Sequence, residues 1–241
     1  MGETVGGDGV LSIPLGDAAA LFGDALSAAA GLDEGGLAGA VEGVIEKRFG
    51  RGVPVLYALQ VHGRLTFTYS AEAPLPPGPH LVGRCDALLT AEPWTALTVR
   101  TADCLPIALA GGGAAAIVHA GWRGLASDIL GAVVGRLHAE FGVKADALAA
   151  AVGIGIGPCH YRVGPEVVAA LAHHPVAGEA WHADGAVDLA RFAAARLAAL
   201  GLDPVRVSVV PGCTACSPTH HSYRRDGPAA GRQWSAVLLA Q

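Results

Sequence analysis

The fold is decided by residues 96–124, which read ALTVRTADCLPIALAGGGAAAIVHAGWRG. Two short apolar segments within this stretch, Ala96–Arg100 and Ala114–His119, are bounded by polar or glycine-rich sequence and predict β-strands. The chain then continues into Ser127–Phe141, where apolar residues recur near helical spacing and Gly142 provides a stop. This succession of strand, turn and helix indicates a domain of the mixed α and β type.

The same signals predict further elements on both sides of this stretch. Helices are expected at Asp17–Ala30, Leu37–Phe49, Pro165–His173 and Asp188–Leu200, and strands at Val53–Val61, Leu65–Tyr69, Leu148–Ile156, Val205–Val210 and Gln233–Leu239. Leu65–Tyr69 reads as a hairpin partner of Val53–Val61, and the proline-rich Pro74–His80 as an irregular loop. Helices and strands mix without strict alternation, so we expect one α/β domain with α+β character, spanning residues 1–241 and built on mixed β-sheets.

Composition excludes some classes of protein. The net charge of −5 argues against a nucleic-acid binder, because affinity for phosphate backbones needs clustered positive charge. Hydrophobic residues make up 52% of the chain, but the longest uncharged run, Leu105–Trp122, contains proline and several glycines and would span a membrane poorly. The start, MGETVGGDG, has no pattern of a secretory signal, and five dispersed cysteines favour a reducing cytoplasm. The sequence leaves the oligomeric state open, and a monomer is one of the states that it allows.

Three potential metal ligands each lie at the end of a predicted strand. His62 stands in QVHG, Cys104 in TADC and His119 in VHAGWRG. Their spacing matches no local finger motif, so only the tertiary fold can bring them together. Two histidines and one cysteine would bind zinc with a fourth position open, which is the catalytic arrangement and activates water. The alternative is that each is an ordinary polar residue near a strand end.

A second candidate site would bind an anion. Gly121 and Gly124 permit a tight turn before a helix that begins near Ser127, and amide donors there beside Arg123 suit a phosphate. Near the C-terminus, Arg224 and Arg225 could bind phosphate bidentately. The plainer alternatives are a glycine turn with a solvated arginine, and an arginine paired with Asp226; Trp122 is expected to pack.

Two other patterns mislead. Cys213–Cys216 is a CxxC and His138–Glu140 an HxE, as in zinc deaminases, but Gly212 separates the proline from the cysteine and the HxE lies late in a helix. We therefore reject that class of deaminase. The ten histidines include no His-x-His pair, which argues against a copper cluster.

Taken in order, QVHG, CDALLT, TADCLPI, VHAGWRG, GIGPCHYRVG and SYRRDG resemble the YfiH-type laccase-domain family. That family is also called the multicopper polyphenol oxidase family and is now regarded as purine nucleoside phosphorylases. The resemblance runs from Val53 to Leu239 and implies layered α/β/β/α mixed sheets related to a cysteine hydrolase-like fold. It also implies a zinc-compatible catalytic triad at His62, Cys104 and His119.

The implied activities are phosphorolysis of adenosine, inosine, guanosine and S-methyl-5'-thioadenosine, and hydrolytic deamination of adenosine. The implied partners are purine nucleosides and phosphate, with zinc as cofactor. This chain departs from the family at His220 and His221, where aromatics are frequent, and at Arg162, where the family often has glutamate. One alternative shares the same residues: a cysteine hydrolase or amidase with Cys104 as nucleophile. The others are the family's older and disputed polyphenol oxidase activity, and a non-enzymatic accessory protein, which only the lack of an unambiguous general base favours.

Overall fold

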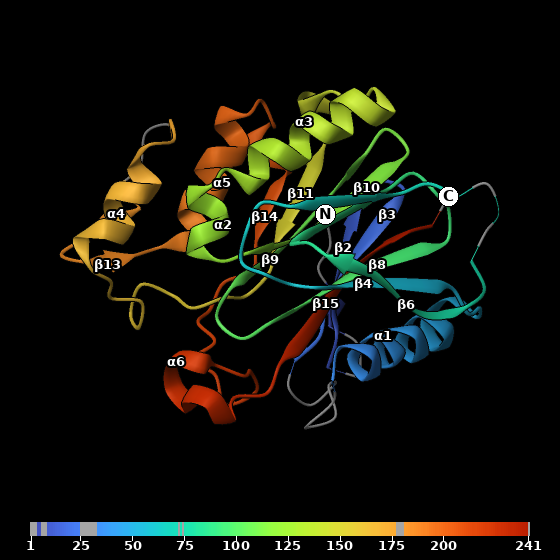
Figure 1. Cartoon of the computed structure of the whole chain (residues 1–241), viewed down its shortest axis with the longest axis horizontal. Helices are drawn as coiled ribbons and strands as arrows, with labels where there is room; N and C mark the ends of the chain where they lie inside the picture. The colour runs from blue at the N-terminus through green and yellow to red at the C-terminus, as the bar shows by residue number, and fades with distance from the viewer. Residues whose placement is uncertain are drawn as a thin grey trace.

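The computed structural model describes residues 4–5, 9–24, 33–71, 73, 75–176 and 181–240. Two large β-sheets pack face to face, and helices cover the outer face of each sheet (Figure 1). The strands are β1 (Thr4–Val5), β2 (Leu11–Leu15), β3 (Ala18–Phe22), β4 (Pro54–Leu59), β5 (Thr66–Tyr69), β6 (Gly78–Arg84), β7 (Ala87–Thr90), β8 (Thr95–Thr101), β9 (Leu105–Gly111), β10 (Ala114–Ala120), β11 (Ala149–Val152), β12 (His182–Ala183), β13 (Ala186–Val187), β14 (Val207–Val209) and β15 (Gln233–Leu239). The α-helices are α1 (Glu34–Phe49), α2 (Trp122–Ala126), α3 (Ile129–Phe141), α4 (Pro165–Ala172), α5 (Leu189–Ala199) and α6 (Tyr223–Asp226). Within the described residues, 3-10 turns lie at Ala145–Ala147, Pro204–Arg206 and Gly227–Ala229.

Both large sheets are mixed. The seven-stranded sheet has the order β1-β2-β3-β15-β8-β4-β6, and the six-stranded sheet the order β14-β11-β9-β10-β7-β5. Strand β4 runs parallel to both β6 and β8, β5 parallel to β7, and β11 parallel to β14. The other pairs in these two sheets are antiparallel. The predicted layered α/β/β/α architecture of mixed sheets is therefore confirmed.

Three apolar clusters hold the layers together. Between the sheets lie side chains such as Leu97 and Ile117, both fully buried. Val41 and Ile45 of α1 pack on the outer face of the seven-stranded sheet. Val133 of α3 and its neighbours pack with α5 on the outer face of the six-stranded sheet. Figure 1 shows the result, with α3 and α5 on one side of the paired sheets and α1 on the other.

Local signals explain the helix ends. Asp33 accepts a hydrogen bond from the Gly36 amide at the start of α1, and Gly50 closes that helix in the left-handed conformation with φ of 70°. Asp128 caps α3 in the same way, and the predicted stop at Gly142 is also left-handed. The predicted helices at Leu37–Phe49 and Ser127–Phe141 are thus confirmed to within a few residues.

The prediction of a helix at Asp17–Ala30 was wrong for its first part. Ala18–Phe22 forms β3, which pairs antiparallel with β2 and with β15, and residues 25–30 lie outside the described residues. Alanine favours helix locally, but the intrinsic preference is small and pairing with two strands overrides it.

Two other expectations about this half of the chain were also wrong. β5 is not the hairpin partner of β4: it lies in the other sheet, parallel to β7. The expected loop at Pro74–His80 contains the start of β6, since pairing with β4 begins at Gly78. None of the helices in the described part of the chain combines the length and apolar character that a bilayer crossing requires.

Candidate active site

The fold brings His62, Cys104 and His119 together. His62 follows β4, Cys104 directly precedes β9, and His119 lies near the end of β10. One ligand atom from each side chain lies within 4.8 Å of those of the other two. The imidazole rings of His62 and His119 meet edge to face with centroids 4.7 Å apart. His119 is buried, Cys104 is partly buried and His62 is exposed, so the cluster opens to solvent on one side.

A buried carboxylate, Asp86, holds two sides of this cluster in place. Its Oδ1 accepts hydrogen bonds from the amides of Val61 (3.1 Å) and His62 (2.8 Å), and its Oδ2 from the amide of Gly63 (2.8 Å). Oδ1 also lies 2.9 Å from Nδ1 of His119. With Nδ1 engaged by the carboxylate, Nε2 is the ring nitrogen of His119 left for Cys104 or a metal.

The charges of the cluster reinforce one another. Burial raises the pKa of the Cys104 thiol, but hydrogen bonds with His119 and His62 outweigh burial and bring the pKa to about 6. Burial lowers the pKa of His119, but hydrogen bonds with Asp86 and Cys104 outweigh it and raise the pKa to about 9. The lowered pKa of Cys104 and the raised pKa of His119 both favour a thiolate beside an imidazolium, and a thiolate is the form that binds metal or attacks carbon.

Backbone conformation at the site is unusual. His62 has φ of 57° and Asp103 φ of 86°, both in the region that favours glycine. Gly121 leaves the room that the cluster needs, because a Cβ there would lie 2.9 Å from Sγ of Cys104 and 3.4 Å from Cδ2 of His62. The glycine turn predicted from the sequence therefore shapes the cluster itself.

The cluster lies in the wall of a cavity of about 430 Å³, within the range of small-molecule sites. Four arginines line this cavity, from the ends of several elements: Arg100, Arg123, Arg224 and Arg232. Among the described lining residues, the one carboxylate is that of Asp103. Aromatic walls come from Trp122, Tyr161 and Tyr223. The cavity can therefore hold an anionic group and a flat ring next to the His–Cys–His cluster.

The three arginines predicted as phosphate ligands are placed differently. Arg123 lies in α2, with Cζ 4.5 Å from the Trp122 ring centroid, and Arg224 with Cζ 5.3 Å from that of Tyr161; both line the cavity. Arg225 does not: its guanidinium pairs with Asp226 and donates to the carbonyl oxygens of Thr214, Ser217 and His220.

The start of α3, near which the sequence suggested an anion site, holds a carboxylate of the chain itself. Asp128 occupies it with its own carboxylate, which accepts from the Gly131 amide and pairs with Arg196 at 2.9 Å. Asp128 thus already supplies the negative charge that favours this end of a helix. Arg162, one of the departures from the family pattern, donates from Nη2 to the carbonyl oxygen of Asp184 at 2.6 Å.

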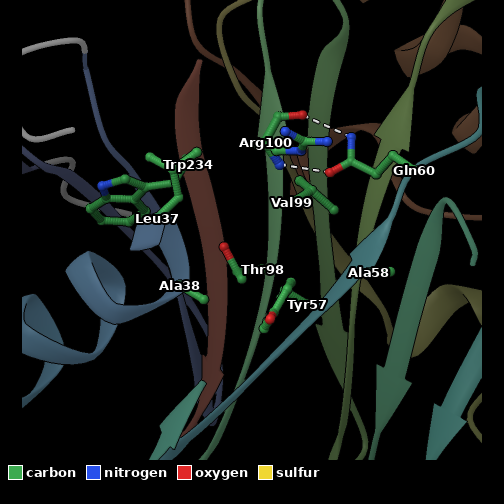
Figure 2. A pocket seen from close by; sticks show the side chains of 9 residues that line it. All are labelled: Leu37, Ala38, Tyr57, Ala58, Gln60, Thr98, Val99, Arg100 and Trp234. Atoms are coloured by element: carbon green, nitrogen blue, oxygen red, sulfur yellow. Dashed lines mark hydrogen bonds between the residues drawn. The ribbon is translucent and has the colours of Figure 1, made fainter. Parts of the chain in front are cut away.

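A second hollow, between α1 and strands β4, β8 and β15, measures only about 10 Å³ and has no room for a nucleoside (Figure 2). Its upper edge nevertheless matters to the site. Figure 2 shows the Gln60 amide bridging to the backbone of Arg100, with Nε2 donating to the carbonyl oxygen (2.8 Å) and Oε1 accepting from the amide (2.9 Å). This bridge ties β8 to the turn that carries His62.

Comparison with known proteins settles the family. Residues 36–240 match the family described as Multi-copper polyphenol oxidoreductase laccase. The chain belongs to this family, the YfiH family. A Streptomyces coelicolor protein named purine nucleoside phosphorylase SCO2081 is 38% identical over 189 residues, covering 75% of this chain and 74% of that protein. A Shigella flexneri protein named purine nucleoside phosphorylase YfiH is 34% identical over 190 residues, covering 75% and 72% respectively.

Solved YfiH-family structures share the fold. The Bacillus licheniformis protein YfiH superposes with a TM-score of 0.82, 20% sequence identity and 98% coverage of both chains. YlmD from Geobacillus stearothermophilus gives 0.81 at 22% identity, again with 98% coverage of both chains. The layered architecture is therefore that of the YfiH family.

The residues present fit a zinc ion. Two imidazoles and a thiolate are the donor set of an open zinc site, and the hydrogen bond from His119 to Asp86 is the support that metal-binding histidines usually have. Sequence reasoning missed Asp86 as a site residue, although CDALLT was recognised as a motif. It also missed Arg100, in strand β8, and Arg232 and Tyr161, in two different loops; these three cavity residues share no local pattern.

Proposed function

We propose that this YfiH-family protein is a purine nucleoside phosphorylase that takes adenosine, inosine, guanosine and S-methyl-5'-thioadenosine, and that it also deaminates adenosine. The observation that carries the proposal is one cavity that is lined both by four arginines and by the cluster of His62, Cys104 and His119. The names of relatives at 34–38% identity support the same activity.

Phosphate binding is assigned to Arg123 and Arg224. Both residues line the cavity, and a guanidinium matches the geometry of phosphate with two parallel hydrogen bonds. Held there, a phosphate oxygen forms a bond to C1′ of the ribose while the bond from C1′ to the purine nitrogen breaks. The bonding electrons leave with the base, which takes up a proton, and ribose 1-phosphate remains. Positioning the phosphate against C1′ is the contribution of the arginines.

The base is assigned to the aromatic wall. Trp122 and Tyr161 line the part of the cavity that adjoins Cys104, and flat rings stack favourably on such side chains. In deamination, water adds at C6 of adenine and ammonia leaves. When bound by His62, Cys104 and His119, zinc supplies a Lewis acid for activating water. Asp86 acts on His119 as a positioning residue in either reaction.

The test is chromatography of purines after incubation of the purified protein with adenosine, with and without phosphate. Adenine and ribose 1-phosphate that form only with phosphate establish phosphorolysis, and inosine in both samples establishes deamination. Adenosine left intact in both samples refutes the proposal. Cys104→Ala and His119→Ala are each expected to abolish turnover while leaving the fold intact. Full activity in both variants would contradict the assigned site.

A second candidate function is a cysteine hydrolase or amidase. The specific observation that favours it is the relay from Cys104 to His119 to Asp86, which has the nucleophile, base and orienting carboxylate of a catalytic triad. A covalent acyl adduct on Cys104, detected by intact mass with an amide substrate, would establish it. Base release that depends on phosphate would decide against it.

The setting that we propose is a single domain acting on small molecules in the cytoplasm. None of the five cysteines is in a disulfide, and unpaired cysteines favour a reducing compartment. The proposed partners are purine nucleosides and phosphate.

A further inference from the structure

A second group of metal-binding side chains lies outside the cluster of His62, Cys104 and His119. Cys159 and His160 come from the turn after β11, and Cys213 and Cys216 from the turn before α6. One ligand atom from each lies within 4.8 Å of those of the other three. These residues, here called the outer cluster, contain the CxxC that had no place in the function derived above.

Three distances within the outer cluster are close to those of a tetrahedral site. Sγ of Cys159 lies 3.6 Å from Sγ of Cys216, and Nδ1 of His160 lies 3.3 Å from Sγ of Cys216 and 3.8 Å from Sγ of Cys213. A tetrahedral zinc with Zn–S bonds of about 2.3 Å and a Zn–N bond of about 2.0 Å separates its sulfur atoms by about 3.8 Å and sulfur from nitrogen by about 3.5 Å.

The backbone holds the residues of the outer cluster in two tight turns. The amides of Cys216 and Ser217 both donate to the carbonyl oxygen of Cys213, which makes the CxxC a tight turn. The turn at Cys159 is closed by the amides of His160 and Tyr161 on the carbonyl oxygen of Gly157. The two turns meet at Gly157, where a Cβ would lie only 3.1 Å from Cβ of Cys213.

We propose that Cys159, His160, Cys213 and Cys216 bind a structural zinc ion. Three thiolates and one imidazole complete a closed four-coordinate site, in contrast to the open set of three at His62, Cys104 and His119. Soft thiolate ligands select zinc over the hard cations magnesium and calcium. The four ligands come from two turns more than fifty residues apart, so the ion would join them in place of a disulfide.

The outer cluster is hydrogen-bonded to residues that line the cavity, so an ion there would stabilise the cavity wall. Thr214, inside the CxxC turn, donates from Oγ1 to Oδ1 of Asp103 at 2.6 Å. The carbonyl oxygen of His160 accepts from Nη1 of Arg224 at 3.0 Å, and Tyr161 follows directly in the chain. Asp103, Arg224 and Tyr161 all line the cavity. A zinc ion in the outer cluster would therefore fix the wall that faces Cys104, without itself touching the substrate.

Metal content measures this directly, and it does so without any assay of turnover. The starting protein is the full chain carrying Cys104→Ala, which disables the cluster of His62, Cys104 and His119. After dialysis against metal-free buffer, elemental analysis is expected to find about one zinc per chain. Adding Cys216→Ser is expected to remove it. Adding Cys85→Ala, which deletes a cysteine outside both clusters, is expected to leave the zinc in place. Circular dichroism checks that each variant is folded.

Cobalt provides a second readout that needs no change in the outer cluster. Cobalt(II) added to the metal-free Cys104→Ala protein is expected to give the visible bands of a tetrahedral site and a strong thiolate-to-cobalt charge-transfer band, displaced by one equivalent of zinc. A Cys104→Ala protein with free thiols that binds neither metal would overturn the proposal. So would a mass lower by two hydrogens that maps to a Cys159–Cys216 disulfide. Since nucleoside turnover plays no part, these outcomes are separate from the test of the phosphorylase activity.

Discussion

Replacing Asp86 with asparagine tests the central feature of the candidate active site. The carboxylate accepts four hydrogen bonds, from the amides of Val61, His62 and Gly63 and from Nδ1 of His119. An asparagine oxygen can take the place of Oδ1 and keep three of them. Its NH₂ group then faces the Gly63 amide, donor against donor. An unpaired buried donor costs about 1–3 kcal/mol, and loss of charge weakens the bond to His119 by about 1 kcal/mol, so we expect about 2–4 kcal/mol less stability.

The activity of Asp86→Asn is expected to fall more than the loss of folded protein explains. Changing the residue that orients a metal-binding histidine typically costs about 10–100-fold in activity or metal affinity. The readout specific to positioning is the titration of His119 in metal-free protein, followed by NMR. Asp86 helps to raise the pKa of His119 to about 9, so the variant is expected to titrate at lower pH.

The matched control is Asp33→Asn at the start of α1, where asparagine caps a helix as well as aspartate does. Stability and activity there are expected to stay unchanged. An Asp86→Asn protein with unaltered stability, activity and His119 titration would refute the reasoning. A protein that is merely less stable, with full activity per folded molecule and the same titration, would reduce Asp86 to a structural role.

Three further predictions address packing, electrostatics and phosphate. Gly121→Ala is expected to lower activity and zinc affinity by crowding Cys104. The control Gly135→Ala, in open space on α3, is expected to stabilise the folded protein by about 0.5–1 kcal/mol. Equal effects of the two substitutions on thermal unfolding and on activity would contradict this. Asp128→Asn is expected to lose about 1–3 kcal/mol at pH 7, measured by urea unfolding, because it leaves the largely buried Arg196 without its charged partner. Burial raises the pKa of Asp128, but Arg196 outweighs it and the net shift is downward; its contribution is thus present above pH about 4 and is lost at lower pH, where wild type and variant should converge. Arg123→Gln is expected to raise the KM for phosphate about 10–100-fold while adenosine deamination without phosphate persists; an unchanged phosphate KM would exclude Arg123 as a ligand.

The parts of the fold that could be predicted are those with strong local signals. Helix α1, predicted at Leu37–Phe49 and observed at Glu34–Phe49, ends at Gly50, and the strand at Gln233–Leu239 is mostly apolar. β3 could not be found this way, because its alanine-rich sequence favours helix and its partner β15 lies at the other end of the chain. Likewise, nothing local shows that β5 leaves the sheet of β4 to pair with β7.

The candidate site likewise contains residues that local sequence indicates and residues that only the tertiary fold brings to it. His62, Cys104 and His119 stand out in the sequence because ligand-type residues follow or end apolar strands, and the structure places them together. The role of Asp86 depends on backbone amides more than twenty residues away, and no sequence pattern reports such bonds. Arg100 is similar, since it belongs to a strand and only the tertiary fold shows that it lines the cavity.

Backbone strain and side-chain chemistry are linked at this site by two carboxylates. His62 and Asp103 both have positive φ, a conformation that costs of order 1–3 kcal/mol and persists only where the surroundings enforce it. Asp86 enforces it at His62 by holding the turn's amides, and the same oxygen orients the ring of His119. Asp103 is held by its own carboxylate, which accepts from Thr214 and from the amide of Arg224. Removing either carboxylate should therefore cost the hydrogen bonds that hold a strained turn and also misplace a cavity residue, so stability should fall and activity should fall by more than the loss of folded protein accounts for.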